Sequence, residues 1–161
     1  MTLEETERLE RAFAERYPDR EEMLDAVTDA TLETLRTPRK LLGYRYLFLA
    51  IRYVLSQPSD TRPGMLSEIY PYVAKCVGTS RVMAERAMHY AICCAWKRAE
   101  PDVLYSYLGL RGADLKNPPT NVEFIYLVAE RVRLIAGDPE GEMRFLRMLS
   151  EAELRFGSRN R

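Results

Sequence analysis

The residues of this sequence best suited to chemistry are His89, Cys93 and Cys94. His89 and Cys93 are four positions apart, so on a helix their side chains would lie one turn apart, as two metal ligands can. A structural zinc site usually needs four ligands, however, and the sequence offers only one further cysteine, Cys76, and no other histidine. We therefore expect no metal site and interpret the cysteines as free thiols in a reducing compartment.

Catalytic patterns are lacking as well. The sequence contains no Ser-His-Asp arrangement, no paired carboxylates and no glycine-rich phosphate loop. The neighbouring Glu85 and Arg86 do not form a catalytic pair. We expect no enzymatic activity and no cofactor.

The segment that carries His89 has the pattern of the second helix of a helix-turn-helix. Residues 65–77 predict a first helix with a bend at Pro71, residues 78–80 (GTS) a turn, and the following residues, to about Trp96, a second helix. Small residues dominate the predicted inward stripe, which allows close helix packing: Ala84, Ala87, Met88, Ala91, Ile92 and Ala95. The predicted outward face mixes basic and apolar residues: Val82, Met83, Arg86, His89, Tyr90, Cys93 and Lys97, with Glu85 at its edge.

Charge is unevenly distributed along the chain. The formal net charge is zero, so the molecule as a whole has no basic field to attract nucleic acid. Residues 1–30 nevertheless hold ten acids against four arginines, whereas residues 75–98 hold five basic residues against the single acid Glu85. This local basic segment is consistent with a DNA-binding face, although ordinary solvated helix faces that differ by chance would give the same pattern.

The rest of the chain predicts helices with short connections. Asp19 and Glu22 form a possible capping box, and Thr120 with Glu123 forms another. The predicted helices span about 3–17, 19–37, 40–56, 101–109, 120–137 and 140–156, with loops at 57–64 and 111–119. No strand alternation is seen, so we predict an all-α fold in a single domain over residues 1–161. No apolar run approaches the ~18 residues of a membrane span, and the acidic N-terminus is unlike a signal peptide.

Several sequence blocks resemble the C-terminal effector domain of the stage-zero sporulation master response regulator of spore-forming bacteria. They are PRKLLGYRYLFLAI (38–51), IYPYVAK (69–75), ERAMHYAICCAW (85–96) and PTNVEFIYLVAERVRL (119–134). The resemblance implies a compact multi-helix domain that places a recognition helix in the major groove of double-stranded DNA. It also implies a cytoplasmic transcription regulator connected with sporulation. We expect a core over residues 24–136, an acidic N-terminal helix over 1–23 and an additional C-terminal helix and tail over 137–161.

The resemblance also assigns the DNA-binding residues. Glu85 and Arg86 fall on family positions that face DNA, whereas Met83 and His89 replace family arginines that contact DNA and Tyr90 replaces a family histidine. We expect Glu85, Arg86 and His89 to face bases. The full predicted set is Thr79, Ser80, Arg81, Val82, Met83, Glu85, Arg86, His89, Tyr90 and Lys97, of which Thr79, Ser80, Arg81 and Lys97 would contact phosphates. Outside this set, the resemblance implies that Asn121 could reach a phosphate, but helix capping alone explains its block. An arginine paired with guanine contributes ~1–3 kcal/mol of discrimination, so the two replacements predict an altered site preference.

Two alternatives stay open at this point. The same fold could serve as a protein-interaction module that has lost DNA reading and uses Val82, Met83, Tyr90 and Cys93 as an apolar contact patch.

The family regulator also has a receiver domain, and the roughly 23 residues before the matching region are too few for one. We therefore expect no control by aspartyl phosphorylation within this chain. The predicted helix at 140–156 either folds back on its own core or pairs two chains in a homodimer.

Overall fold

The fold is helical throughout the part of the chain that can be described. The computed structural model describes Glu4, Arg8 and residues 19–57, 67–110 and 115–137. Its labelled helices are α2 (Arg20–Thr34), α3 (Leu42–Leu55), α4 (Ile69–Val77), α5 (Arg81–Arg98), α6 (Pro101–Leu108) and α7 (Asn121–Gly137). These ranges contain no strand, which confirms the prediction of an all-α fold. Apart from Glu4 and Arg8, the helices predicted at 3–17 and 140–156 lie outside the described residues.

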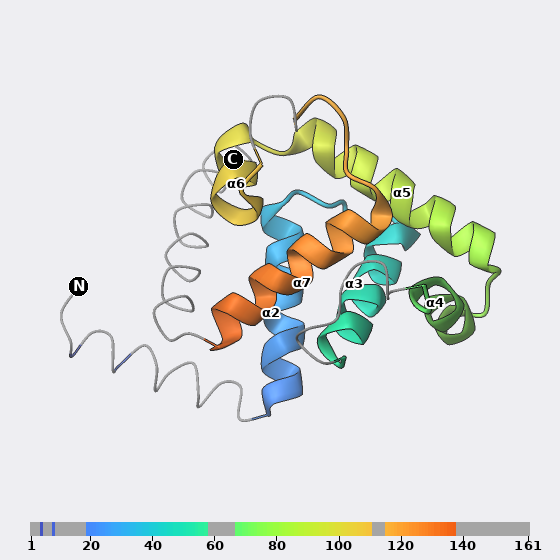
Figure 1. The fold of residues 1–161 in the computed structure, drawn as a ribbon, viewed down its shortest axis with the longest axis horizontal. Coiled ribbons are helices and arrows are strands. Elements are labelled where there is room, and N and C mark those ends of the chain that lie inside the picture. Colours follow the sequence, from blue (N-terminus) through green and yellow to red (C-terminus); the bar gives the residue numbers. More distant parts are fainter. Residues whose placement is uncertain (1–3, 5–7, 9–18, 58–66, 111–114, 138–161) are drawn as a thin grey trace.

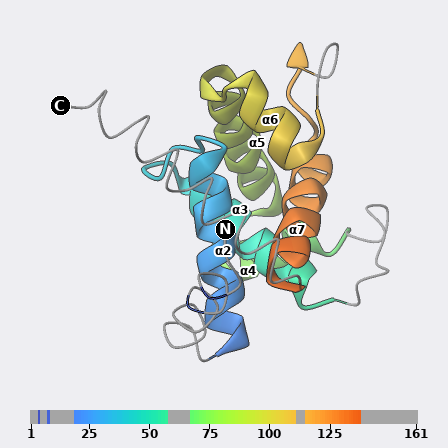
Figure 2. The same cartoon turned by 90° about the vertical axis from the view of Figure 1, so that its left-hand side faces the viewer.

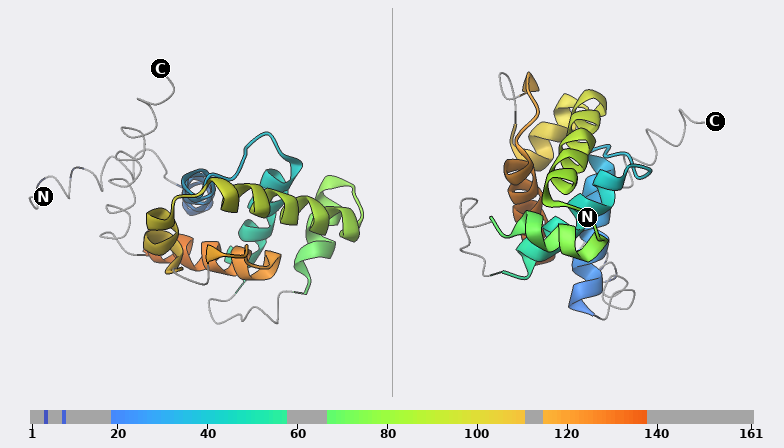
Figure 3. Two further views of the ribbon diagram at one scale, coloured as in Figure 1. Left: turned by 90° about the horizontal axis from the view of Figure 1, so that it is seen from above. Right: turned by 90° about the vertical axis from the view of Figure 1, so that its right-hand side faces the viewer.

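The core is formed where α2, α3 and α7 pack against one another (Figures 1 and 2). Their fully buried side chains include Leu32 on α2, Leu47 and Ile51 on α3, and Phe124 and Val128 on α7. Figure 3 shows α5 running along one side of this group, with α4 near one of its ends and α6 near the other. The apolar faces of these three helices thus form the core, and α5 packs chiefly against α3 and α4, with a smaller contact to α7.

The ends of these helices follow the capping residues of the sequence. The Asp19 carboxylate accepts a hydrogen bond from the Glu21 amide at 2.8 Å, and the Thr120 hydroxyl oxygen accepts one from the Glu123 amide at 3.2 Å. Both residues therefore cap their helices, satisfying amide groups that have no partner inside the helix. Thr120 does so through Glu123 as predicted, whereas Asp19 does so through Glu21 rather than Glu22. Gly109 ends α6 in the left-handed conformation, with φ of 69°.

One predicted boundary is wrong. Residues 65–77 were expected to form one helix bent at Pro71, but Ser67 and Glu68 lie in a turn and α4 begins at Ile69. Pro71 is consequently the third residue of the helix. Amides in this first turn have no intrahelical acceptor, so the missing N–H of proline costs nothing there and no bend is needed.

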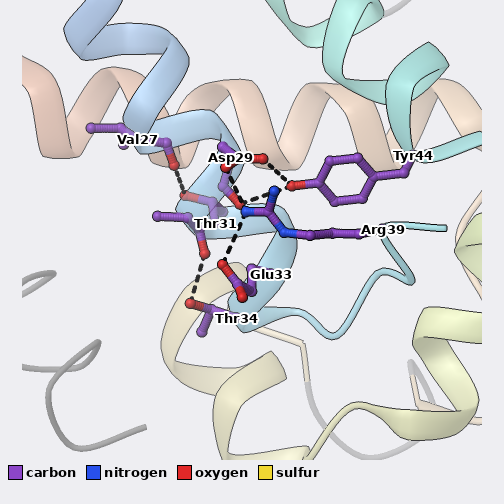
Figure 4. Close-up of polar contacts among 8 residues, drawn as sticks. Val27, Asp29, Thr31, Glu33, Thr34, Arg39 and Tyr44 are labelled. Carbon is purple, nitrogen blue, oxygen red and sulfur yellow. Dashed lines mark hydrogen bonds and ion pairs between the residues drawn. The ribbon is translucent and has the colours of Figure 1, made fainter. Parts of the chain in front are cut away.

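A polar network ties the connection between α2 and α3 to α2 (Figure 4). The Arg39 guanidinium donates to the carboxylates of Asp29 at 2.6 Å and Glu33 at 3.2 Å. The Tyr44 hydroxyl donates to the Asp29 carboxylate, and burial together with this bond raises the pKa of Tyr44 above its ordinary value. Because Tyr44 lies in the first turn of α3, the network fixes where α3 begins relative to α2.

Gly43, the residue before Tyr44, lies directly against the backbone of α5. A Cβ atom at Gly43 would lie 2.1 Å from the Ala87 carbonyl oxygen and 2.7 Å from the Ala91 Cβ. Such distances are far below van der Waals contact, so only glycine permits this crossing. The residues predicted to face inward on α5 do so: Ala84, Met88, Ala91, Ile92 and Ala95 are buried and Ala87 is half-buried.

Candidate nucleic-acid interface

A helix, a tight turn and a second helix are formed by α4, residues 78–80 and α5. Gly78 ends α4 with φ of 70°, a left-handed conformation that favours glycine. The Thr79 amide then donates to the Ala74 carbonyl at 3.0 Å. The Ser80 hydroxyl oxygen accepts from the Met83 amide at 3.1 Å and caps α5. The predicted helix-turn-helix geometry is therefore present, and local hydrogen bonds define the turn.

The predicted DNA-binding residues gather on the outer face of α5 and the turn before it. Most of them are exposed: Ser80, Arg81, Val82, Met83, Glu85, Arg86, His89, Tyr90 and Lys97. Thr79 and Cys93 are half-buried. Among large apolar side chains, Val82 and Met83 are each 54% exposed and Tyr90 is 61% exposed. The outer face thus presents both charged and apolar groups to a partner.

The basic side chains on and beside α5 have no acidic partner in the described part of the chain. The ion pairs found there join Arg36, Arg39, Arg52 and Arg133 to acids on other parts of the fold. None involves Lys75, Arg81, Arg86, Lys97 or Arg98. Within the described residues no carboxylate neutralises their charge, which is there available to an anion such as a phosphate backbone.

A groove of about 650 Å³ separates the outer face of α5 from the start of α7. Its lining combines predicted residues of α5 with residues from α4 and from the start of α7: Tyr70, Val82, Glu85, Arg86, His89, Tyr90, Cys93, Thr120, Asn121 and Val122. Tyr70, Thr120, Asn121 and Val122 were not among the predicted site residues. Tyr70 and Asn121 lie within the IYPYVAK and PTNVEF blocks of the resemblance, which was the available signal for them.

Histidine and cysteine meet within this groove. The Cys93 Sγ lies 3.4 Å from the His89 Nε2, which agrees with the one-turn separation expected from the sequence. No group of three or more potential metal ligands occurs among the residues that the structure describes. Among the described residues the pair therefore forms a polar contact in the lining of the groove and not part of a recognisable metal site.

Comparison with known protein families matches residues 28–132 to the family described as sporulation initiation factor Spo0A C terminal. This stretch runs from within α2 to within α7 and includes the whole helix-turn-helix. The chain belongs to this family. The Spo0A C-terminal family consists of DNA-binding regulatory domains concerned with transcription in sporulation, not of enzymes. The resemblance inferred from the sequence blocks is thereby confirmed.

The Spo0A C-terminal match is slightly narrower than the core expected from the sequence, residues 24–136. Residues 1–27 and 133–161 lie outside it. No helix in the described ranges is long and apolar enough to cross a membrane.

Proposed function

We propose that this chain is a double-stranded DNA-binding transcription regulator that inserts α5 into the major groove and has a site preference different from that of the family's regulator. The observation that supports the proposal is the outer face of α5, which is exposed and holds basic side chains that pair with no acid among the residues the structure describes. An α-helix fits the major groove, and its exposed side chains can then reach base edges.

Individual roles follow from the chemistry of the exposed side chains. Arg86 can donate two hydrogen bonds to guanine, and Glu85 can accept one from the amino group of cytosine. Val82 and Met83 suit apolar contact with the methyl group of thymine. Ser80, Arg81 and Lys97 would contact phosphates, and Thr79, being half-buried, would contribute chiefly through its position in the turn.

The altered preference rests on Met83 and His89, which replace arginines expected from the resemblance. Selection from a random duplex pool tests it, comparing the unaltered chain with the double variant M83R/H89R. We expect the two proteins to select different sequences, with guanine gained at the positions read by the restored arginines. Selection of one common sequence by both proteins would show that these positions do not set the preference.

A protein-interaction module is the second candidate function, favoured by the large exposed fractions of Val82, Met83 and Tyr90. Exposed apolar groups of this kind are common on protein-binding surfaces. Under this alternative the folded chain would bind no duplex DNA at low salt, and substitution of Met83 and Tyr90 by serine would abolish binding to a protein partner.

The proposal extends to the organisation of the chain. Residues 24–136 would be the DNA-binding core of a single domain, flanked by the acidic segment 1–23 and by 137–161. The protein would act in the cytoplasm without enzymatic activity or a cofactor. A homodimer would supply the area that sequence-specific DNA interfaces usually need beyond one small module.

A further inference from the structure

Asn121, the first residue of α7, is placed unlike a surface capping residue. This residue is only 6% exposed, although asparagine is usually found at the surface. The Asn121 Nδ2 donates a hydrogen bond of 3.0 Å to the backbone carbonyl of Glu85, which lies in the second turn of α5. The cap of α7 is supplied by Thr120 instead. A side chain of α7 is therefore bonded to the backbone of the recognition helix at the turn that carries Glu85 and Arg86.

Tyr70 of α4 completes the contact from a third helix. The Arg81 guanidinium, at the first residue of α5, lies 5.9 Å from the centre of the Tyr70 ring. Tyr70 and Asn121 line the same groove; burial raises the pKa of Tyr70, and the Asn121 amide lowers it. Tyr70 and Asn121 thus support α5 at two successive points, its first residue and its second turn.

The chemistry of the Asn121 amide indicates a role beyond packing. Within the described part of the chain its Oδ1 is buried and accepts no hydrogen bond, which is unfavourable for folding. A small apolar residue at this position would avoid that cost, but the contact between α7 and α5 would then lose its hydrogen bond to the Glu85 carbonyl. Asn121 and Tyr70 both line the groove beside Glu85 and Arg86.

We propose that Asn121 is a positioning residue for DNA recognition: its amide sets the orientation of α5 relative to the start of α7, so that Glu85 and Arg86 meet base edges. Asn121 itself does not contact DNA in this proposal, which agrees with its burial. The inference rests on the proposed DNA-binding function and adds to it a residue outside the recognition helix.

The test compares three variants of the full chain. N121A removes the amide, and N121D keeps the volume of the side chain but replaces the donor with an acceptor that faces the Glu85 carbonyl. T120A is the matched control, because it removes the cap of the same helix and leaves Asn121 in place. Each protein is titrated with the duplex that the unaltered chain selects from a random pool and with an unrelated duplex. Residual dipolar couplings measure the orientation of α5 relative to α7 in the absence of DNA.

We expect N121A and N121D each to lower the ratio of selective to non-selective affinity by about tenfold or more, as the loss of one base contact would. The affinity for the unrelated duplex should stay within about twofold, since phosphate contacts are retained. The orientation of α5 should change in both variants and remain unaltered in T120A.

Two results would overturn the proposal. One is an unchanged affinity ratio and an unchanged orientation of α5 in N121A or, if N121A does not fold, in N121D. The other is an affinity ratio that falls in N121A but not in N121D. An aspartate at a helix N-terminus supports the helix through its charge, so this result would show that Asn121 only stabilises α7. Failure of the unaltered chain to bind any duplex would contradict the proposed function instead, and the dipolar couplings would still test the positioning.

Discussion

Replacement of Gly43 by alanine tests how α3 holds the recognition helix. The added Cβ would lie 2.1 Å from the Ala87 carbonyl oxygen, whereas ordinary contacts begin near 3.4 Å. The obstructing atom belongs to the backbone of α5, so it cannot move away as a flexible side chain would. Either the two helices separate locally or α5 shifts along α3.

The expected loss of stability in G43A combines two opposing effects. Alanine is favoured over glycine within a helix by ~1 kcal/mol, whereas overpacking of a well-packed core typically costs ~1–3 kcal/mol and sometimes more. Since the overlap involves backbone, we expect the upper end of that range or above it and a net destabilisation of about 2 kcal/mol. For a protein of this size the melting temperature should fall by roughly 4–8 °C.

Thermal unfolding followed by circular dichroism measures this effect, and G137A provides the control. Gly137 ends α7 and has no atom within 4 Å of its would-be Cβ, so the same substitution should be neutral or mildly stabilising there. If G43A melts at or above the temperature of the unaltered protein, the close crossing of α3 and α5 does not exist as described.

Three further perturbations address DNA binding, pH and assembly. R86A should weaken binding to the selected duplex by ~1–3 kcal/mol and relax the preference at one base position, with R45A, which removes an exposed arginine of α3, as control; an unchanged preference would exclude Arg86 from base reading. Burial raises the pKa of Tyr107 to about 12, above the value near 10 of an unfolded chain, so this group stabilises the fold below pH 10 and that stability is lost as the pH rises towards 12. Between pH 10 and 12 the free energy of unfolding, measured by urea titration, should therefore fall less in Y107F than in the unaltered protein. An equal fall in both proteins would show that Tyr107 does not cause the loss of stability. Deletion of residues 138–161 should convert a dimer into a monomer in light scattering and weaken DNA binding together, whereas a full-length monomer both free and on DNA would refute the homodimer.

Local patterns in the sequence predicted much of this structure. The apolar stripe of α5, the caps at Asp19 and Thr120, and the glycine turn at Gly78 each depend on residues within a few positions, and all are found as expected. The start of α4 was not predicted. The sequence of residues 65–68 is compatible with a helix, and only the structure shows that Pro71 lies in the first turn of α4.

The contacts that position α5 could not be read from local patterns. Gly43 and Ala87 meet across a helix crossing, and Asn121 bonds to Glu85 across 36 positions of sequence. Helical periodicity shows which face of each helix is buried but not which residues of two helices face each other. The predicted outer face of α5 was therefore correct, whereas the groove formed with Tyr70 and Asn121 required the folded structure.

Duplex DNA binding over a series of salt concentrations tests the central claim most directly. Fluorescence anisotropy with a labelled duplex pool of random sequence would measure affinity for the full chain, with folding verified by circular dichroism in the same buffers. Our account predicts binding at low salt whose affinity falls steeply and log-linearly as salt rises, because phosphate contacts release counterions. It also predicts a shallower salt dependence for the double variant R81A/K97A. A folded protein that binds no duplex at low salt would contradict the account.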